Sequence, residues 1–303
     1  MMQTTTLGRT GFNVSVAGLG CGGPSRLGTR EGYGGTEEDA VGLVRLAIDS
    51  GVNLLDTAVV YRTEGIVGRA VRESGRRDDL FVTSKAGVDQ SPAEFAKSID
   101  ASLQTLGLDH LDAYFLHGVK PSELPAAMEN LVPVLHDAQS AGKIRFLAIS
   151  ELFQDDPAHH MFRSLYANNA WADVFDVIMV GFNLLNPSAR RHVLPHTGRL
   201  NIGTLCMFAV RRALSDAQRR GEVLDEMNLP AETLDFLGDA ESVTEKGYRF
   251  CRHEPGIDCV LFGTGNQNHL RVNVRSINGN PLSADDAKRL NDLFGTRESV
   301  SGS

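Results

Sequence analysis

Short apolar runs alternate with longer amphipathic stretches along the whole chain. Helical periodicity marks segments such as 37–50, 64–75, 92–106 and 124–141. The apolar runs predict eight strands, at 16–21, 53–58, 80–85, 111–117, 144–149, 174–182, 202–208 and 258–263. Several runs are apolar at consecutive positions, as strands covered on both faces require. Eight such strands alternating with helices predict a closed (β/α)8 TIM barrel, formed as a single domain over residues 1–303.

Three segments fall outside this alternation. Residues 4–15 alternate around a glycine-containing turn at 8–11, which predicts a β-hairpin that caps the bottom of the barrel. The segment 210–253 is long and rich in Arg, Asp and Glu, which favours a lid or a substrate or cofactor contact over an extra helix packed outside the barrel. The tail after Thr296 is expected to be frayed.

Composition narrows the functional classes. An apolar fraction of 42% and a charged fraction of 22% are typical of a globular protein. A net charge of -8 argues against a nucleic-acid partner. The four cysteines form no CxxC pair, which favours buried thiols in a reducing compartment. Residues 1–6 lack a leader pattern and no apolar run is long enough for a membrane span, so we expect a cytoplasmic protein.

Four polar residues lie at or just beyond the ends of three successive predicted strands. Asp56 and Tyr61 follow the second strand, Lys85 ends the third and His117 ends the fourth. The spacing is 29 residues from Asp56 to Lys85 and 32 from Lys85 to His117, close to the roughly 30 residues of one strand-helix unit. We therefore expect all four on the same face of a parallel sheet.

These residue types suit the reduction of a carbonyl group. Hydride arriving at a carbonyl carbon leaves negative charge on the oxygen, so an acid must supply a proton as that charge forms. Tyr61 can be this acid, and a nearby Lys85 cation should lower the pKa of its phenol. Asp56 can hold the ammonium, and His117 can donate a hydrogen bond to the carbonyl oxygen. Each residue alone has an ordinary structural explanation, and the combination favours chemistry.

The chain resembles the aldo-keto reductase family in residues 56–64, 83–85 and 115–117. Residues 7–11, 142–145 and 263–273 extend the resemblance over most of the chain. It implies a barrel that binds a nicotinamide cofactor, NADP or NAD, without a Rossmann domain. The implied reaction interconverts an aldehyde or ketone and its alcohol, with sugars as the favoured small-molecule substrates. The implied catalytic tetrad is Asp56, Tyr61, Lys85 and His117.

The resemblance also implies a nicotinamide contact, which departs here from the usual pattern. Relatives often have Ser-Asn after the fifth strand and Gln on the sixth, where this chain has Ser150, Glu151 and Met179. Glu151 can still accept a hydrogen bond from the carboxamide, whereas Met179 offers almost none. Phe208 is expected to stack under the nicotinamide ring, with core packing as the alternative.

At the adenosine end, the resemblance places the cofactor against the residues that follow the eighth strand. Where relatives specific for the 2′-phosphate often carry Lys and Arg, this chain aligns Gly263 and His269. Losing such contacts erodes preference for the phosphorylated cofactor, so use of both cofactors, or of NAD, is expected. Backbone amides can still bind phosphate oxygens. The expected contacts are Gly263, Thr264, Gly265, His269 and Asn273.

Other motifs are weaker. Residues 18–23 fit G-x-G-x-x-G, but no helix follows directly, so a tight turn at the barrel mouth is the better interpretation. His192 and His196 have helical zinc spacing with Pro195 between them, and His159 and His160 are adjacent. Both pairs are interpreted as surface features, and no metal site is predicted.

Two other functions remain open. Glycoside hydrolysis would need facing carboxyl groups such as Asp56 and Glu151, and would leave the other tetrad members without a joint role. A regulatory protein that binds the cofactor and keeps vestigial reductase activity would retain the same residues. The sequence does not predict the oligomeric state.

Overall fold

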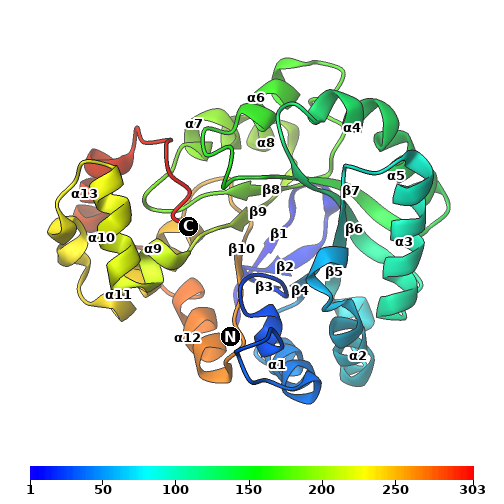
Figure 1. Ribbon diagram of the computed structural model, residues 1–303, viewed down its shortest axis with the longest axis horizontal. Helices are drawn as coiled ribbons and strands as arrows, with labels where there is room; N and C mark the ends of the chain where they lie inside the picture. The colour runs from blue at the N-terminus through cyan, green and yellow to red at the C-terminus, as the bar shows by residue number, and fades with distance from the viewer.

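The computed structural model describes residues 1–303, apart from the side chain of Ala240, and shows a closed barrel of parallel strands (Figure 1). In order around the barrel the strands are β10 (Cys259–Phe262), β3 (Ala17–Gly20), β4 (Leu54–Asp56), β5 (Phe81–Gly87), β6 (Leu111–Val119), β7 (Ile144–Glu151), β8 (Val177–Gly181) and β9 (Gly203–Met207). All eight predicted strands are present, so the predicted (β/α)8 barrel is confirmed.

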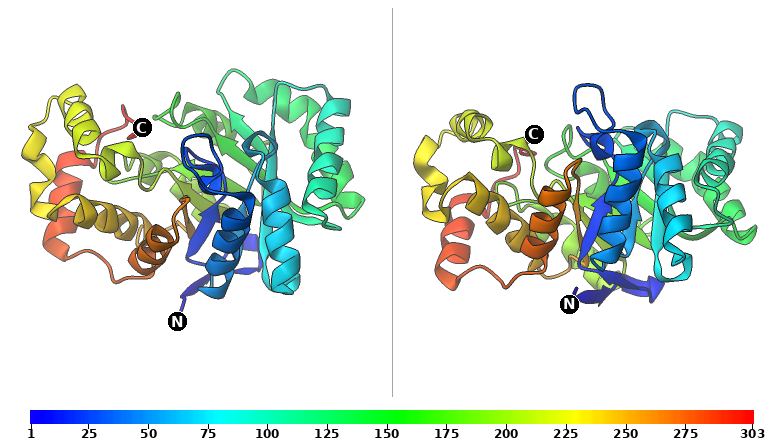
Figure 2. Two further views of the ribbon diagram at one scale, coloured as in Figure 1. Left: turned by 60° about the horizontal axis from the view of Figure 1, so that its bottom comes forward. Right: turned by 90° about the horizontal axis from the view of Figure 1, so that it is seen from below.

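The N-terminal hairpin closes one end of the barrel. Strands β1 (Thr4–Thr6) and β2 (Asn13–Ser15) pair in antiparallel fashion. Leu7 and Val14 are fully buried and belong to the same cluster as Leu54 and Phe81, the first residues of β4 and β5. The hairpin therefore covers the amino ends of the strands, at the opposite end from the loop after β3 (Figure 2).

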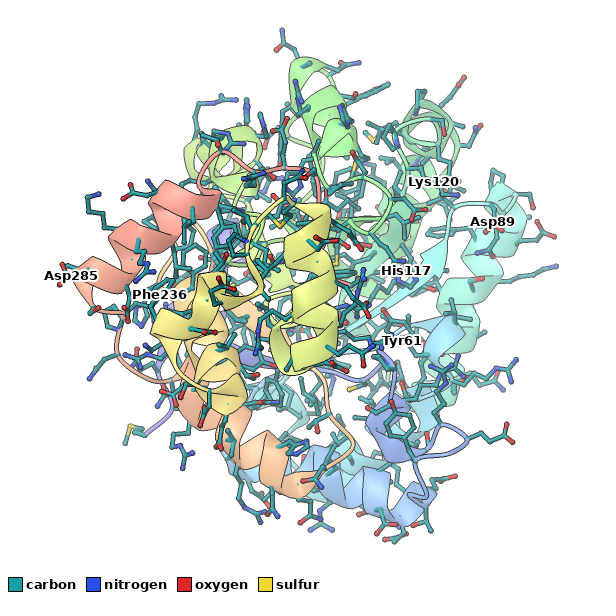
Figure 3. The ribbon with its side chains drawn as sticks, turned by 60° about the vertical axis from the view of Figure 1, so that its left-hand side comes forward. Tyr61, Asp89, His117, Lys120, Phe236 and Asp285 are labelled. Atoms are coloured by element: carbon teal, nitrogen blue, oxygen red, sulfur yellow. The ribbon has the colours of Figure 1, made fainter. Side chains whose placement is uncertain are left out.

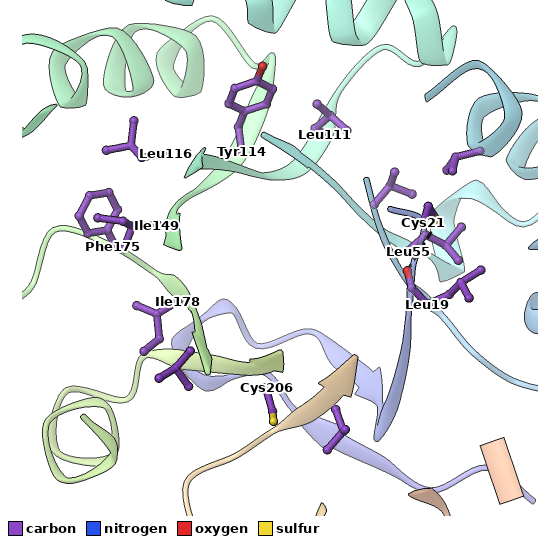
Figure 4. Close-up of a cluster of buried hydrophobic side chains, with 14 of the residues drawn as sticks. Leu19, Cys21, Leu55, Leu111, Tyr114, Leu116, Ile149, Phe175, Ile178 and Cys206 are labelled. Atoms are coloured by element: carbon purple, nitrogen blue, oxygen red, sulfur yellow. Dashed lines mark hydrogen bonds between the residues drawn. The ribbon is translucent and has the colours of Figure 1, made fainter. Parts of the chain in front are cut away.

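The strand pleat separates two hydrophobic cores. Side chains such as Leu54, Phe115 and Val177 form a cluster inside the barrel. Their neighbours in sequence, such as Leu55 and Ile178, join the cluster between the strands and the surrounding helices (Figure 4). Because side chains alternate along a strand, this partition shows which residues at the strand ends face the barrel axis.

The helices form the outer layer. Capping boxes at Thr36 and Ser91 start α1 and α3, as the sequence predicts. The predicted helix over 124–141 is divided into α4 and α5, because Pro133 has no amide hydrogen to continue the bonding ladder. The helices up to β9 are α1 (Glu37–Asp49), α2 (Glu64–Ser74), α3 (Pro92–Leu106), α4 (Leu124–Asn130), α5 (Val132–Ser140), α6 (His160–Ala167), α7 (Ala189–His192) and α8 (Leu194–Leu200).

The segment after β9 builds a helical lobe beside the barrel. Its helices are α9 (Arg212–Ser215), α10 (Ala217–Glu226), the 3-10 helix η5 (Ala231–Leu237) and α11 (Ala240–Arg252). After β10 come α12 (Gln267–Ile277) and α13 (Ala284–Phe294). Residues of α10, η5 and α13 share a core of their own that includes Leu224, Leu237 and Phe294. The lobe is thus packed outside the barrel, and it also reaches the site described below.

The C-terminal tail is ordered against the barrel, so the expectation of fraying is wrong. The Asn183 side-chain amide donates to the Ser301 carbonyl at 3.0 Å, and the Asn186 amide donates to the Val300 carbonyl at 2.8 Å. The Ala213 amide donates to the Gly302 carbonyl at 3.1 Å. Buried amides that need acceptors therefore hold the tail in place. Among the described residues, no helix has the length and apolar character that crossing a membrane requires.

Candidate active site

Three strand ends bring the predicted tetrad together at the carboxyl face of the barrel. Asp56 lies two residues after Leu54, and His117 lies two residues after Phe115, so both are on the inward face of their strands. Lys85 is inward by the same rule, four residues after Phe81. Tyr61 ends the short 3-10 helix η3 (Val59–Tyr61) after β4 and lies beside His117 (Figure 3).

Lys85 and Asp56 form a buried ion pair. The Lys85 side chain is 1% exposed and Asp56 is 3% exposed. Lys85 Nζ donates to Asp56 Oδ1 at 2.5 Å and to the Thr57 carbonyl oxygen at 2.7 Å. The Thr83 hydroxyl donates to the same Asp56 oxygen at 2.8 Å. The ammonium is therefore held in one position by neighbouring strands.

The Tyr61 side chain is close to both His117 and Lys85. Its hydroxyl is 3.3 Å from His117 Nε2, and Lys85 Nζ lies 5.0 Å from the centroid of the Tyr61 ring. Gly22 packs directly on this ring, because a Cβ there would lie 2.5 Å from Tyr61 Cδ2 and Cε2. The close approach of the loop after β3 thus limits the positions open to the phenol.

The pKa of Tyr61 is shifted in the direction opposite to the one expected from the sequence. Burial raises the pKa of Tyr61 and outweighs the Lys85 cation, which acts to lower it as predicted. Burial also acts to lower the pKa of Lys85, but the Asp56 carboxylate prevails and the net shift is upward. Burial and the Lys85 charge lower the pKa of His117 to about 3. Near neutral pH the site therefore holds a protonated phenol, an ammonium and a neutral imidazole.

A groove runs outward from the tetrad. Its inner part is lined by Asp56, Tyr61, Met179, Phe208 and other residues. Its outer part is lined by residues that include Tyr33, Tyr248 and the segment that leads into α12. The two parts adjoin each other, since both are lined by Pro24, Ser25, Val210, Ser215 and Gly263.

Seven of the nine predicted cofactor-contact residues line this groove. Met179, Phe208 and Gly263 line the inner part. Gly263 also lines the outer part, together with Thr264, Gly265, His269 and Asn273. Gly265 closes tightly on the loop after β3, because a Cβ there would lie 2.5 Å from Gly28. The lining thus combines the Phe208 ring, which can stack on a nicotinamide, with backbone amides at residues 263–265 that can bind phosphate oxygens, so these residues fit a dinucleotide.

The structure does not bring Ser150 and Glu151 into the groove lining. Ser150 Oγ accepts from the Gly118 amide at 2.9 Å and donates to the Leu116 carbonyl at 3.3 Å. Glu151 lies two residues after Ile149, whose side chain faces the surrounding helices, so Glu151 also points away from the barrel axis. Its carboxylate instead binds His159 Nδ1 at 2.9 Å and the Gly181 amide at 2.8 Å.

The interpretation of His159 as a surface residue is therefore wrong. Its side chain is fully buried, whereas His160 is exposed as expected. His192 is partly buried and lies 3.0 Å from a Glu298 carboxylate oxygen, and His196 stacks on the Tyr166 ring. Among the described residues, no three His, Cys, Asp or Glu side chains gather as a metal site would require.

Close packing explains two of the glycines of residues 18–23, Gly18 and Gly22. A Cβ on Gly18 would lie 2.7 Å from Leu261 and 2.9 Å from Leu54. These positions leave room for neighbours inside the barrel, as Gly22 does for Tyr61. All four cysteines are buried and free, as the sequence predicts.

Sequence reasoning missed Arg211, which lines the inner part of the groove. Its guanidinium carbon lies 4.2 Å from the centroid of the Phe208 ring. The available signal was the pair of arginines directly after an apolar strand, a place where the loops of a barrel carry function.

Comparison with known proteins agrees with this geometry. The family model described as "Aldo/keto reductase family" matches residues 21–294. The chain is 26% identical to the aldo-keto reductase YhdN of Bacillus subtilis, over 97% of this chain and 94% of the relative. It is 33% identical to L-galactose dehydrogenase of Arabidopsis thaliana, over 50% of this chain and 49% of that protein.

Solved structures share the whole fold. The holo form of the aldo-keto reductase AKR11C1 from Bacillus halodurans superposes with a TM-score of 0.75 at 21% identity, covering 99% of this chain and 98% of that one. An aldo/keto reductase from Klebsiella pneumoniae, solved in complex with NADP and acetate, gives 0.72 at 19% identity with the same coverage.

Proposed function

This chain belongs to the aldo/keto reductase family, and from that premise we propose that it is a nicotinamide-dependent enzyme that interconverts an aldehyde or ketone and its alcohol. The observation that carries the proposal is the convergence of Tyr61, His117 and the Lys85–Asp56 pair, of which Tyr61 and Asp56 line the inner part of the groove. The Klebsiella relative was solved with NADP, which supports a cofactor of this class. When bound, the reduced nicotinamide supplies the hydride.

In this proposal the protein's residues control the proton. Tyr61 holds a proton on its hydroxyl near neutral pH and donates it to the carbonyl oxygen as negative charge develops there. Lys85, held by Asp56, stabilises the phenolate that remains. His117 stays neutral, and in the tautomer with hydrogen on Nε2 it can donate to the same oxygen.

The direct test mixes the purified protein with NADPH or NADH and a panel of aldehydes, including aldose sugars, and follows the absorbance of the reduced cofactor. We expect turnover that depends on both cofactor and aldehyde. Cofactor binding without turnover of any aldehyde would instead favour the regulatory binding protein. Release of a sugar from a glycoside without cofactor would favour hydrolysis.

The two directions of the reaction should respond differently to pH. Reduction needs the Tyr61 proton, and burial keeps the pKa of this phenol above its ordinary value of about 10. We expect reduction to stay level over about pH 6 to 9, and alcohol oxidation, which needs the phenolate, to rise by about tenfold per pH unit there. Because the pKa of His117 is about 3, no inflection from this residue is expected near its ordinary value. A reduction rate that changes with an inflection near pH 6.5 would contradict the assignment of a low pKa to His117.

The outer part of the groove should discriminate little between NADPH and NADH. No Lys or Arg is among the described residues that line it, so the 2′-phosphate has no cationic side chain to bind. We expect the two dissociation constants, measured by fluorescence titration, to agree within about tenfold. His269→Arg adds such a cation and should favour NADPH by a further tenfold or more. A wild-type preference for NADPH of a hundredfold would contradict the expectation.

A further inference from the structure

Arg211 is a cation without an acidic partner at the inner part of the groove. Its side chain is half-buried, and among the described residues no carboxylate forms an ion pair with it. The Nε atom of Arg211 is buried and has no hydrogen-bond partner among the described residues. Arg190, which is also partly buried, is paired with Glu254 at 2.6 Å. Arg220 and Arg252 each have a buried guanidinium nitrogen without a partner as well, but neither lines the groove, which sets Arg211 apart from them. Because buried donors are normally satisfied, the unpaired guanidinium indicates a place for an anion that the protein does not itself supply.

The platform beneath Arg211 is rigid. The guanidinium lies over the Phe208 ring, and that ring packs edge-on against Phe153 with 5.4 Å between centroids. Phe153 stacks on His159 at 5.3 Å, and His159 is fixed by the carboxylate of Glu151. This series of contacts orients the cation before any ligand arrives, which reduces the entropy lost on binding.

Phe208 has a left-handed backbone conformation, and its ring contacts both Arg211 and Phe153. Its φ is +64°, a conformation that L-residues seldom adopt, and its carbonyl accepts from the Asn183 side-chain amide at 3.3 Å. Phe153 in turn lies on the backbone of β8, because a Cβ at Gly181 would lie 2.0 Å from its ring. Strain and close packing of this kind are found where a site is held in a particular geometry.

We propose that Arg211 binds an anionic group of the substrate, so that the protein acts preferentially on carbonyl compounds that carry a carboxylate or phosphate. This inference rests on the proposed reductase function. Arg211 lines the part of the groove that contains Tyr61 and not the outer part that contains His269 and Asn273. Tyr61 and Arg211 therefore face the same part of the groove, where a substrate carbonyl would meet the phenol. The bound cofactor's pyrophosphate is the other source of such an anion, and the test separates the two.

The test compares 4-carboxybenzaldehyde with its neutral methyl ester. For Arg211→Gln, we expect kcat/KM for the carboxylate to fall by about 10- to 100-fold, while the ester changes by less than about threefold. Arg211→Lys keeps the charge but not the two-pronged geometry, so it should give an intermediate loss. Arg199→Gln is the control, because this arginine of α8 is exposed, lines neither part of the groove and has its charge screened by water. In the control, the ratio of kcat/KM for the carboxylate to kcat/KM for the ester should change by less than about twofold.

Binding measurements give a readout that does not depend on turnover. Calorimetry with 4-carboxybenzaldehyde and the protein saturated with oxidised cofactor should show weaker binding in Arg211→Gln than in wild type. A loss of NADPH affinity in Arg211→Gln, with equal losses for both substrates, would overturn the proposal and assign Arg211 to the pyrophosphate. The proposal would also be overturned if all variants bound 4-carboxybenzaldehyde equally well and had the same ratio of kcat/KM for the carboxylate to kcat/KM for the ester. Wild type that reduces no aldehyde of the whole panel would refute the reductase function, whereas the calorimetric comparison would still decide the role of Arg211.

Discussion

A Tyr61→Phe variant is expected to reduce aldehydes about 10²- to 10⁴-fold more slowly than wild type while binding the cofactor with nearly unchanged affinity. The substitution removes only the hydroxyl that lies 3.3 Å from His117, and keeps the ring that packs against Gly22. The loss should appear in kcat, because the proton is transferred in the transition state and not in the bound ground state. Steady-state kinetics and a fluorescence titration with NADPH measure the two effects separately.

Tyr166→Phe is the matched control for this variant. The Tyr166 hydroxyl is buried and has no hydrogen-bond partner among the described residues, and its ring stacks on His196 with 4.7 Å between centroids. Removing this hydroxyl should leave kcat unchanged and should not lower the stability of the fold. Similar kcat values for Tyr61→Phe and wild type would remove Tyr61 from the role of acid.

Asp56→Asn is expected to lower the free energy of unfolding by about 3–5 kcal/mol. The variant leaves the Lys85 ammonium almost completely buried without its carboxylate, and keeps the size of the side chain and an acceptor for the Thr83 hydroxyl. Without Asp56, burial should dominate and the pKa of Lys85 should fall, so the cation that stabilises the Tyr61 phenolate is weakened. Activity should therefore fall together with stability, as measured by urea unfolding and by kcat.

The double variant Asp56→Asn/Lys85→Met separates the two effects. It removes the buried charge together with its partner, so it should be more stable than Asp56→Asn alone. Its activity should remain as low as that of the single variant, because the cation beside Tyr61 is absent. If Asp56→Asn unfolds at the same urea concentration as wild type, the ion pair does not hold the site together in the way that we infer.

The order of the elements could be predicted from local pattern alone. Each strand is a short apolar run and each helix has a recognisable periodicity, and capping residues such as Thr36 and Ser91 mark the starts. The single helix expected over 124–141 missed the effect of Pro133, which local reasoning could have detected. The ordered tail could not be detected in this way, because its hydrogen bonds come from Asn183 and Asn186, more than a hundred residues away.

Within the site, prediction was most reliable for residues at strand ends. Asp56, Lys85 and His117 converge because regular spacing places successive parallel strands at one face. Glu151 was predicted as a cofactor contact from the family resemblance, but its side chain turns outward from the barrel to the buried His159. A one-residue step along a strand reverses the face, and only the register of the barrel reveals which face each residue takes.

By itself the sequence determined the barrel and the identity of the four polar groups at its mouth, because these depend on periodicity and spacing along the chain. Only the tertiary structure decided the electrostatics of that mouth, including the net upward shift in the pKa of Tyr61 and the lack of a partner for Arg211. Both depend on how completely water is excluded and on which charges approach from distant segments, and neither quantity is encoded in any local run of residues.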